Sequence, residues 1–181
     1  MGWKHRIFTK KRHKAQCYSR YKGRNSSRVP SIINTCIEVT QESVDALKNH
    51  IQMSGNENCG VIMGSVTTEN LIRVNKISDS LCKSQSAKTC CCVLDRVKAN
   101  IFIHEDYEHS NHTRVYIGEW HTHPENIPSP SSVDVSSIMD SFKRNDRPIK
   151  GFILMVIVGR EDIYWGFYDG IELKRVYPTY V

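Results

Sequence analysis

Along residues 31–181 the chain alternates between apolar runs of strand length and apolar positions at helical spacing. Residues 32–39 predict a first strand. Thr40 is a candidate N-cap for a helix whose apolar face lies within residues 44–51. Because Gly55 follows, we expect the helix to end close to that position.

The later segments repeat this alternation. The predicted strands are 59–66, 71–77, 115–120, 149–158, 163–168 and 171–176, and the predicted helices are 95–109 and one that begins at Ser131 or Ser132. Residues 149–158 are nearly all apolar, as in a strand covered on both faces, and the Asp-Gly pair after residue 168 indicates a hairpin. Residues 80–92 fit neither period. The pattern predicts an α/β fold with a mixed sheet, flanked by helices.

Charge divides the chain into two parts. Residues 1–30 contain ten Lys and Arg and no acidic residue, whereas the remainder has 15 basic and 19 acidic residues and a net charge of −4. Residues 1–30 are therefore expected to form a mobile basic tail, and residues 31–181 one domain. The basic pI describes the tail alone, so nucleic-acid binding is an option only for residues 1–30.

The distribution of apolar residues argues against a membrane protein. No apolar run approaches the roughly 20 residues that cross a bilayer, and no apolar stretch follows the basic N-terminus as in a secretory signal. A cytoplasmic protein without a membrane partner is expected. Its seven cysteines are then expected to be reduced, and Cys90-Cys91-Cys92 lacks the C-x-x-C spacing of a zinc site.

His121 and His123 carry the clearest chemical signal. In an extended segment, positions two apart point to the same face, so both imidazoles can reach one ion. Asp134 follows after three prolines that force a turning path. Two imidazoles and one carboxylate are the ligand set of a catalytic zinc ion, whose fourth position is left for water. The sequence therefore predicts one Zn²⁺ at His121, His123 and Asp134.

Hydrolysis at such a zinc ion needs a carboxylate that shuttles protons. Glu57 is the best candidate, because it lies where a loop enters the buried strand 59–66 and can approach a metal held by a neighbouring strand. Gly60 and Gly64 were expected to allow close approach of backbone or substrate. Glu119 is an alternative, expected to lie on the surface or behind the ligands. Ser131 is expected either to cap a helix or to donate to an oxyanion.

Other metal motifs fit less well. His104, Glu105 and His109 resemble H-E-x-x-H, but the histidines are five positions apart and would lie on different helical faces. These residues are expected to belong to a solvated helix.

Taken together, Glu57, His121-Thr-His123-Pro124, Ser131 and Asp134 resemble the JAMM motif of the JAB/MPN metalloproteases without a departure in spacing. The resemblance covers about residues 31–181. It implies a cytidine-deaminase-like α/β fold and cleavage after the C-terminus of a conjugated protein. By position, it makes Glu57 the general base and then acid, His121, His123 and Asp134 the zinc ligands, and Ser131 the oxyanion donor.

Within the family, residues 118–124 look like a prokaryotic subgroup encoded beside E1- and E2-like enzymes, some of which serve antiphage defence. This implies a conjugated nucleotidyltransferase or ubiquitin-like protein as substrate and a functionally linked E1/E2-like ligase as partner. Two alternatives remain open at this point. One is a non-catalytic MPN binding scaffold, and the other is a DNA-associated role similar to that of the RadC group.

Overall fold

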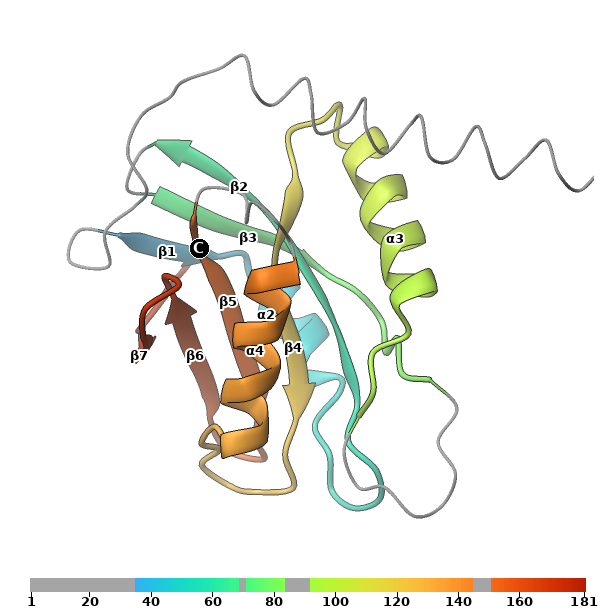
Figure 1. Cartoon of the computed structure of the whole chain (residues 1–181), viewed down its shortest axis with the longest axis vertical. Coiled ribbons are helices and arrows are strands. Elements are labelled where there is room, and N and C mark those ends of the chain that lie inside the picture. The colour runs from blue at the N-terminus through green and yellow to red at the C-terminus, as the bar shows by residue number, and fades with distance from the viewer. Residues whose placement is uncertain (1–34, 69–70, 84–91, 145–150) are drawn as a thin grey trace, which may run out of the picture.

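The computed structural model describes residues 35–68, 71–83, 92–144 and 151–181, which include the whole motif (Figure 1). The predicted basic tail, residues 1–30, lies outside the described residues, as do Cys90 and Cys91. Within the described part of the chain, no helix is long and apolar enough to cross a membrane.

Eight strands form one mixed sheet. The strands are β1 (Cys36–Val39), β2 (Cys59–Thr68), β3 (Leu71–Ile77), β4 (Val115–Thr122), β5 (Ile153–Val158), β6 (Ile163–Tyr168), β7 (Leu173–Arg175) and β8 (Thr179–Tyr180). Their order in the sheet is β7-β6-β5-β4-β2-β3-β1-β8. The pairs β1–β3, β1–β8 and β4–β5 are parallel, and the others are antiparallel. The predicted α/β class with a mixed sheet is confirmed.

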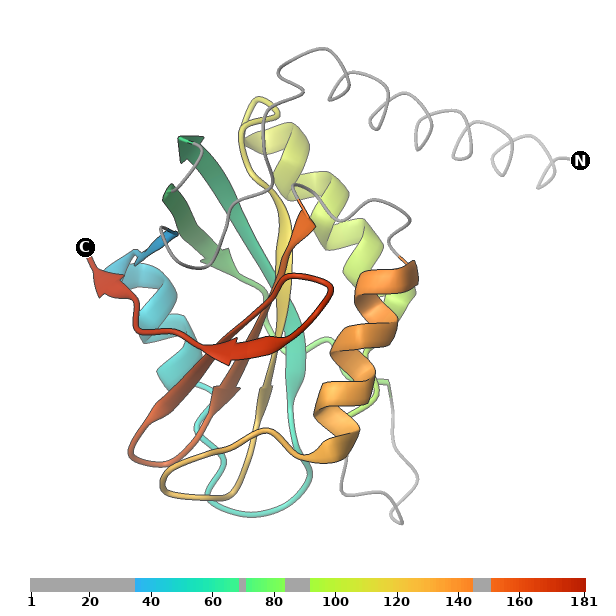
Figure 2. The same cartoon turned by 60° about the vertical axis from the view of Figure 1, so that its left-hand side comes forward.

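The helices lie on both sides of this sheet. They are α2 (Gln41–Lys48), α3 (Arg96–His109) and α4 (Ser132–Arg144). In both cartoon views α2 covers one face, while α3 and α4 cover the other (Figure 2). Strand β5 is buried along its whole length, as its apolar sequence predicted. Its alternate residues Ile153, Met155 and Ile157 pack with Ile138 of α4, and the others join the larger core.

The first helix is shorter than its pattern predicted. Thr40 caps it, because its hydroxyl accepts a hydrogen bond from the Ser43 backbone N–H. The helix ends at Lys48, six residues before Ser54, and the following N–H groups of His50 and Ile51 bond to carbonyls only three residues back. Ile51, predicted to lie on the helix's apolar face, is half-exposed instead.

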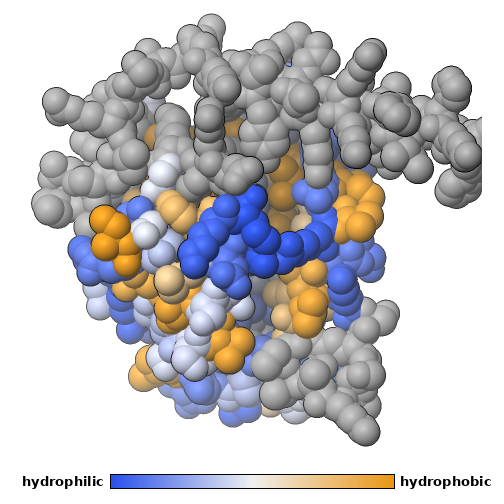
Figure 3. All heavy atoms as spheres, viewed as in Figure 1, coloured by the Kyte–Doolittle hydropathy of each residue, from blue (hydrophilic) through white to orange (hydrophobic). Residues whose placement is uncertain are grey.

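The predicted helix 95–109 is present as α3, and some of its apolar residues face outward. Its apolar residues Val97 and Ile101 are 70% and 49% exposed, and on the face drawn in Figure 3 apolar and polar side chains are interspersed. The helix instead buries Ala99, Asp106 and Tyr107. One of these inward positions is an aspartate, so the buried face does not form a continuous apolar stripe.

The buried carboxylate of Asp106 joins α3 to the sheet. Its side chain is 1% exposed, and it accepts hydrogen bonds from Arg114 Nη2 at 2.6 Å and Arg114 Nε at 2.9 Å, with Lys76 Nζ at 3.0 Å. Burial by itself raises the pKa of Asp106. The hydrogen bonds from Arg114 and Lys76 together outweigh burial and hold the pKa below its ordinary value.

We expect Asp106→Asn to lower the free energy of unfolding by about 3 kcal/mol at neutral pH, because it leaves Arg114 half-buried without its counter-ion. The folded-state pKa of Asp106 is lowered. Its contribution to the free energy of unfolding is therefore complete above the unfolded-state pKa of about 3.9, and it is lost as pH falls through the folded-state pKa. Urea unfolding across this pH range measures the effect. The exposed Asp140→Asn is the control, and an equal loss in both variants would contradict this role for Asp106.

Gly60 and Gly64 serve packing within the sheet. A Cβ at Gly60 would collide with the Ser78 hydroxyl and with Trp120 Nε1, and one at Gly64 with Ile117 and the backbone of Arg73. The predicted close approach of backbone is therefore found at Gly64, whereas the neighbours of Gly60 are side chains. No substrate contact follows from it.

Candidate metal centre

The histidine pair lies at the end of β4, the strand between β2 and β5. His121 is the next-to-last residue of β4, and His123 follows the strand directly. Thr122, between them, is fully buried on the opposite side, where its hydroxyl donates to Gln52 Oε1 at 2.8 Å and accepts from the Asn58 N–H at 2.9 Å. The His123 N–H also donates to the Val158 carbonyl at 3.0 Å. These bonds fix which way both imidazoles point.

Asp134 reaches the same place from the first turn of α4. The Ser131 hydroxyl accepts a hydrogen bond from the Asp134 N–H at 3.2 Å, and the Asp134 carboxylate accepts one from the Ser131 N–H at 2.7 Å. This reciprocal pair is a capping box with aspartate in the third helical position. The cap positions the carboxylate and leaves the Ser131 O–H proton free to donate elsewhere.

The three predicted metal ligands converge. His121 Nε2 lies 3.3 Å from Asp134 Oδ1, and His123 Nε2 lies 3.5 Å from Asp134 Oδ2. All three ligand atoms lie within 4.8 Å of one another. Zinc binds imidazole nitrogen at about 2.0–2.1 Å and carboxylate oxygen at about 2.0–2.2 Å. A tetrahedral ion with bonds of this length needs its ligand atoms about as far apart as the histidine nitrogens and the Asp134 oxygens are here.

The polar atoms of the cluster fit a cation. His121 Nε2 is buried and makes no hydrogen bond with any described residue, so it has a lone pair or proton directed at the gap between the three side chains. Burial alone raises the pKa of Asp134, but the two imidazoles outweigh it and lower that pKa strongly. The bond to Asp134 likewise raises the pKa of His123 against its burial. The carboxylate is therefore ionised and suited to a positive partner.

Glu57, just before β2, lies beside His123, just after the neighbouring strand β4. In the antiparallel β2–β4 pair, Cys59 is opposite His121, so the residue two positions earlier reaches the level of His123. Glu57 Oε1 is 4.0 Å from His123 Nε2, and its side chain is 19% exposed. Its other oxygen accepts a hydrogen bond from the Cys92 N–H at 3.4 Å. The predicted base thus stands beside the metal ligands with one oxygen directed towards them.

The alternative residues lie elsewhere. Glu119 accepts a hydrogen bond from the Tyr116 hydroxyl at 2.9 Å and belongs to no metal-ligand group among the described residues. His104 and His112 are exposed and pair with Glu108 around α3, at 3.9 and 3.0 Å. Neither histidine belongs to a metal-ligand group in the part of the chain that the structure describes.

One group beside the site was not predicted. Cys59, Cys82 and Cys92 gather their sulfur atoms next to Glu57. Their separations of 23 and 10 residues match no short metal-binding spacing, so only the register of β2 with its neighbours could have indicated the cluster.

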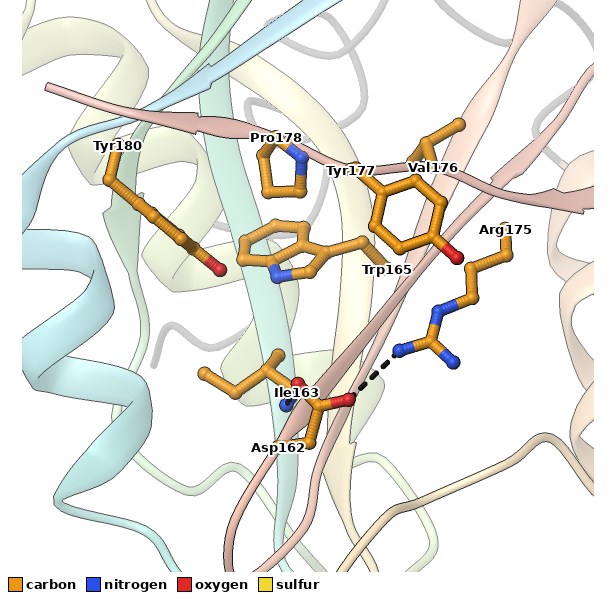
Figure 4. A pocket seen from close by; sticks show the side chains of 8 residues that line it. All are labelled: Asp162, Ile163, Trp165, Arg175, Val176, Tyr177, Pro178 and Tyr180. Carbon is orange, nitrogen blue, oxygen red and sulfur yellow. Dashed lines mark hydrogen bonds and ion pairs between the residues drawn. The ribbon is translucent and has the colours of Figure 1, made fainter.

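A separate pocket of about 230 Å³ lies between β6 and the segment that leads to β8 (Figure 4). It is lined by Asp162, Ile163, Trp165, Arg175, Val176, Tyr177, Pro178 and Tyr180. Arg175 and Asp162 form an ion pair at its edge, at 2.8 Å. It shares no residue with the metal centre.

Comparison with known families gives a match over most of the sheet and the site. Residues 40–168 match the family described as prokaryotic homologs of the JAB domain. A solution structure of a protein from Desulfitobacterium hafniense superposes with a TM-score of 0.56 at 17% identity, covering 80% of this chain and 92% of that one. At that identity the likeness concerns the fold alone.

Three curated relatives carry the name CD-NTase/cGAS isopeptidase. The proteins from Escherichia coli and Vibrio cholerae are 39% and 40% identical over stretches that cover 41% of this chain. Those stretches span 44% and 46% of the two relatives, which is less than half of their length. The protein from Pseudomonas aeruginosa is 29% identical over 72% of this chain and 81% of its own length.

Proposed function

Because the chain belongs to the family of prokaryotic JAB-domain proteins, we propose that it is a zinc-dependent isopeptidase that cleaves after the C-terminus of a conjugated protein. The observation that carries the proposal is the convergence of two imidazoles and two carboxylates, from His121, His123, Asp134 and Glu57, at one end of β4. This set contains both a metal site and a separate proton shuttle.

Three of these residues would hold the ion: His121, His123 and Asp134. A bound zinc ion supplies two effects, a lower pKa for water and polarisation of the scissile carbonyl. Glu57 takes a proton from the attacking water on Oε1 and returns it to the nitrogen of the leaving amine. Glu57 lies beside His123 but is not one of the metal ligands. Its carboxylate therefore remains free to gain and lose a proton, which suits this role.

Ser131 has two roles that are compatible. As the cap of α4 it accepts the Asp134 N–H, and its own O–H then donates to the oxyanion that forms at the scissile carbonyl. The two possibilities left open by the sequence therefore describe the same hydroxyl group used as an acceptor and as a donor.

We expect Ser131→Ala to lower cleavage by about 10²–10³-fold through loss of the oxyanion donor and to destabilise the fold by about 1 kcal/mol through loss of the cap. Ser131→Thr keeps both functions and should restore most of the rate. The measurement is kcat for conjugate cleavage together with urea unfolding. A loss of stability without a loss of kcat would make Ser131 a cap only.

We propose that the conjugated protein is a nucleotidyltransferase, joined through its C-terminus to a target lysine by an E1/E2-like ligase. The name CD-NTase/cGAS isopeptidase, shared by the three curated relatives, supports this substrate class. A ubiquitin-like protein is the second substrate that the motif supports.

The test uses both conjugates, each linked to a lysine side chain, with zinc-loaded full chain. We expect release of the nucleotidyltransferase, loss of cleavage after chelation and recovery on addition of zinc. Faster release of the ubiquitin-like protein would reassign the substrate, and hydrolysis of neither conjugate by zinc-loaded protein would overturn the proposal.

The two other candidate functions have separate tests. A non-catalytic scaffold would bind no zinc at His121, His123 and Asp134. A DNA-associated role would rest on the ten cationic residues of the tail, 1–30, which lie outside the described residues. It predicts salt-dependent DNA binding by the full chain that is lost from residues 31–181.

A further inference from the structure

Three cysteines from three separate segments meet beside the metal centre. Cys59 begins β2, Cys82 pairs with Leu94 in an isolated bridge after β3, and Cys92 precedes α3. The Cys92 sulfur lies within bonding distance of the sulfur atoms of both Cys59 and Cys82, and those two are 3.6 Å apart. Cys59 is buried and the other two are half-buried.

Three converging sulfur atoms are more than one disulfide can use. A sulfur atom bonds one other sulfur in a disulfide, so pairing Cys92 with either neighbour leaves the third thiol packed against the bridge. A thiophilic cation accepts all three as ligands at once. Zinc is the common ion of clustered thiolates, bound at about 2.3 Å from each sulfur.

The surroundings of Cys82 favour a negative sulfur. Its Sγ accepts a hydrogen bond from the Cys59 N–H at 3.3 Å and one from the Ser80 hydroxyl at 3.4 Å. Hydrogen bonds of this kind stabilise a metal-bound thiolate. The Glu57 carbonyl, 3.6 Å from the same sulfur, accepts the S–H of the protonated thiol, and this contact is the one that a metal ion would replace.

We propose that Cys59, Cys82 and Cys92 bind a second zinc ion, distinct from the one at the histidines. Binding to three protonated thiols forms three Zn–S bonds and releases three protons, with one further ligand completing a tetrahedral shell. This second ion would contact neither the substrate nor the transferred protons of the proposed function, so either zinc ion can be bound without the other.

The second site also bears on the position of Glu57. Cys92 donates its N–H to Glu57 Oε2 at 3.4 Å, and Cys59 lies two residues after Glu57. A metal ion on these cysteines would fix the loop that presents the carboxylate to His123. Cys92 is thereby a positioning residue, acting on the base through its backbone.

The experiment measures metal content and cobalt spectra of the full chain, purified with a reducing agent. We expect two zinc ions per chain in the wild type and in Cys36→Ser, which changes an exposed cysteine outside the cluster. His123→Ala and Cys92→Ser should each retain one, and the double variant none. After cobalt substitution, the thiolate-to-cobalt absorption should persist in His123→Ala and disappear in Cys92→Ser.

One result would overturn the site: a His123→Ala protein that binds no metal and shows no thiolate-to-cobalt absorption. Under the same reducing conditions, an intact mass two hydrogens below that of the reduced chain, with peptide mapping that places the disulfide among Cys59, Cys82 and Cys92, would do the same. Both readouts use folded proteins with all three cysteines, so they hold even where Cys92→Ser fails to fold. A wild type with only the histidine-bound zinc would leave the proposed function intact.

Discussion

Glu57→Gln is expected to slow cleavage of the isopeptide conjugate by about 10²–10⁴-fold while zinc remains bound at the histidines. The amide keeps the size and the hydrogen bond of the carboxylate to the Cys92 N–H, but it cannot take a proton from water. Because Glu57 is not among the three converging metal ligands, the metal content should equal that of the wild type. The measurement pairs single-turnover cleavage with zinc analysis.

Glu119→Gln is the matched control for this variant. Glu119 is the other carboxylate near the histidines in sequence, but it accepts a hydrogen bond from Tyr116 and belongs to no metal-ligand group within the described ranges. Its variant should cleave at nearly the wild-type rate. A Glu57→Gln protein with the wild-type rate, or an equal loss in both variants, would show that the base has been assigned to the wrong residue.

His123→Ala is expected to remove the histidine-bound zinc and bring cleavage to the background rate. A site with three protein ligands loses one of them, and loss of even an outer-shell partner typically weakens metal binding by about 10–100-fold. We therefore expect at least a 100-fold weaker affinity at this site, measured by competition with a chromogenic chelator.

His104→Ala, on the exposed surface of α3, serves as the control and should match the wild type in affinity and rate. Wild-type affinity in His123→Ala would contradict the ligand assignment. Loss of metal without loss of cleavage would instead contradict the need for zinc in the reaction.

Much of the geometry of the candidate metal ligands could be predicted from sequence because it is local. Alternation along an extended strand places His121 and His123 on one side whatever the rest of the fold does. Ser131 and Asp134 are three residues apart and form a helix cap through reciprocal hydrogen bonds, and this cap orients the Asp134 carboxylate. The approach of Asp134 to the histidines needs the packing of α4 on β5, and that of Glu57 needs the register of β2 with β4.

The features that escaped prediction depend on contacts between distant segments. Strand β8 has two residues, Thr179 and Tyr180, too few to show a period, and it exists through its pairing with β1. Helix α3 buries Asp106 in place of an apolar residue because Arg114 and Lys76 come from other elements to neutralise it. The cysteine cluster likewise joins β2 to residues that follow β3.

Cleavage of a lysine-linked nucleotidyltransferase conjugate in water enriched in heavy oxygen tests the central claim most directly. The account predicts that the zinc-loaded chain releases the nucleotidyltransferase with one heavy oxygen atom in its C-terminal carboxylate and restores an unlabelled lysine amine on the target. It also predicts that chelation stops the reaction. An intact conjugate after incubation with protein whose His121, His123 and Asp134 site holds zinc would contradict the account.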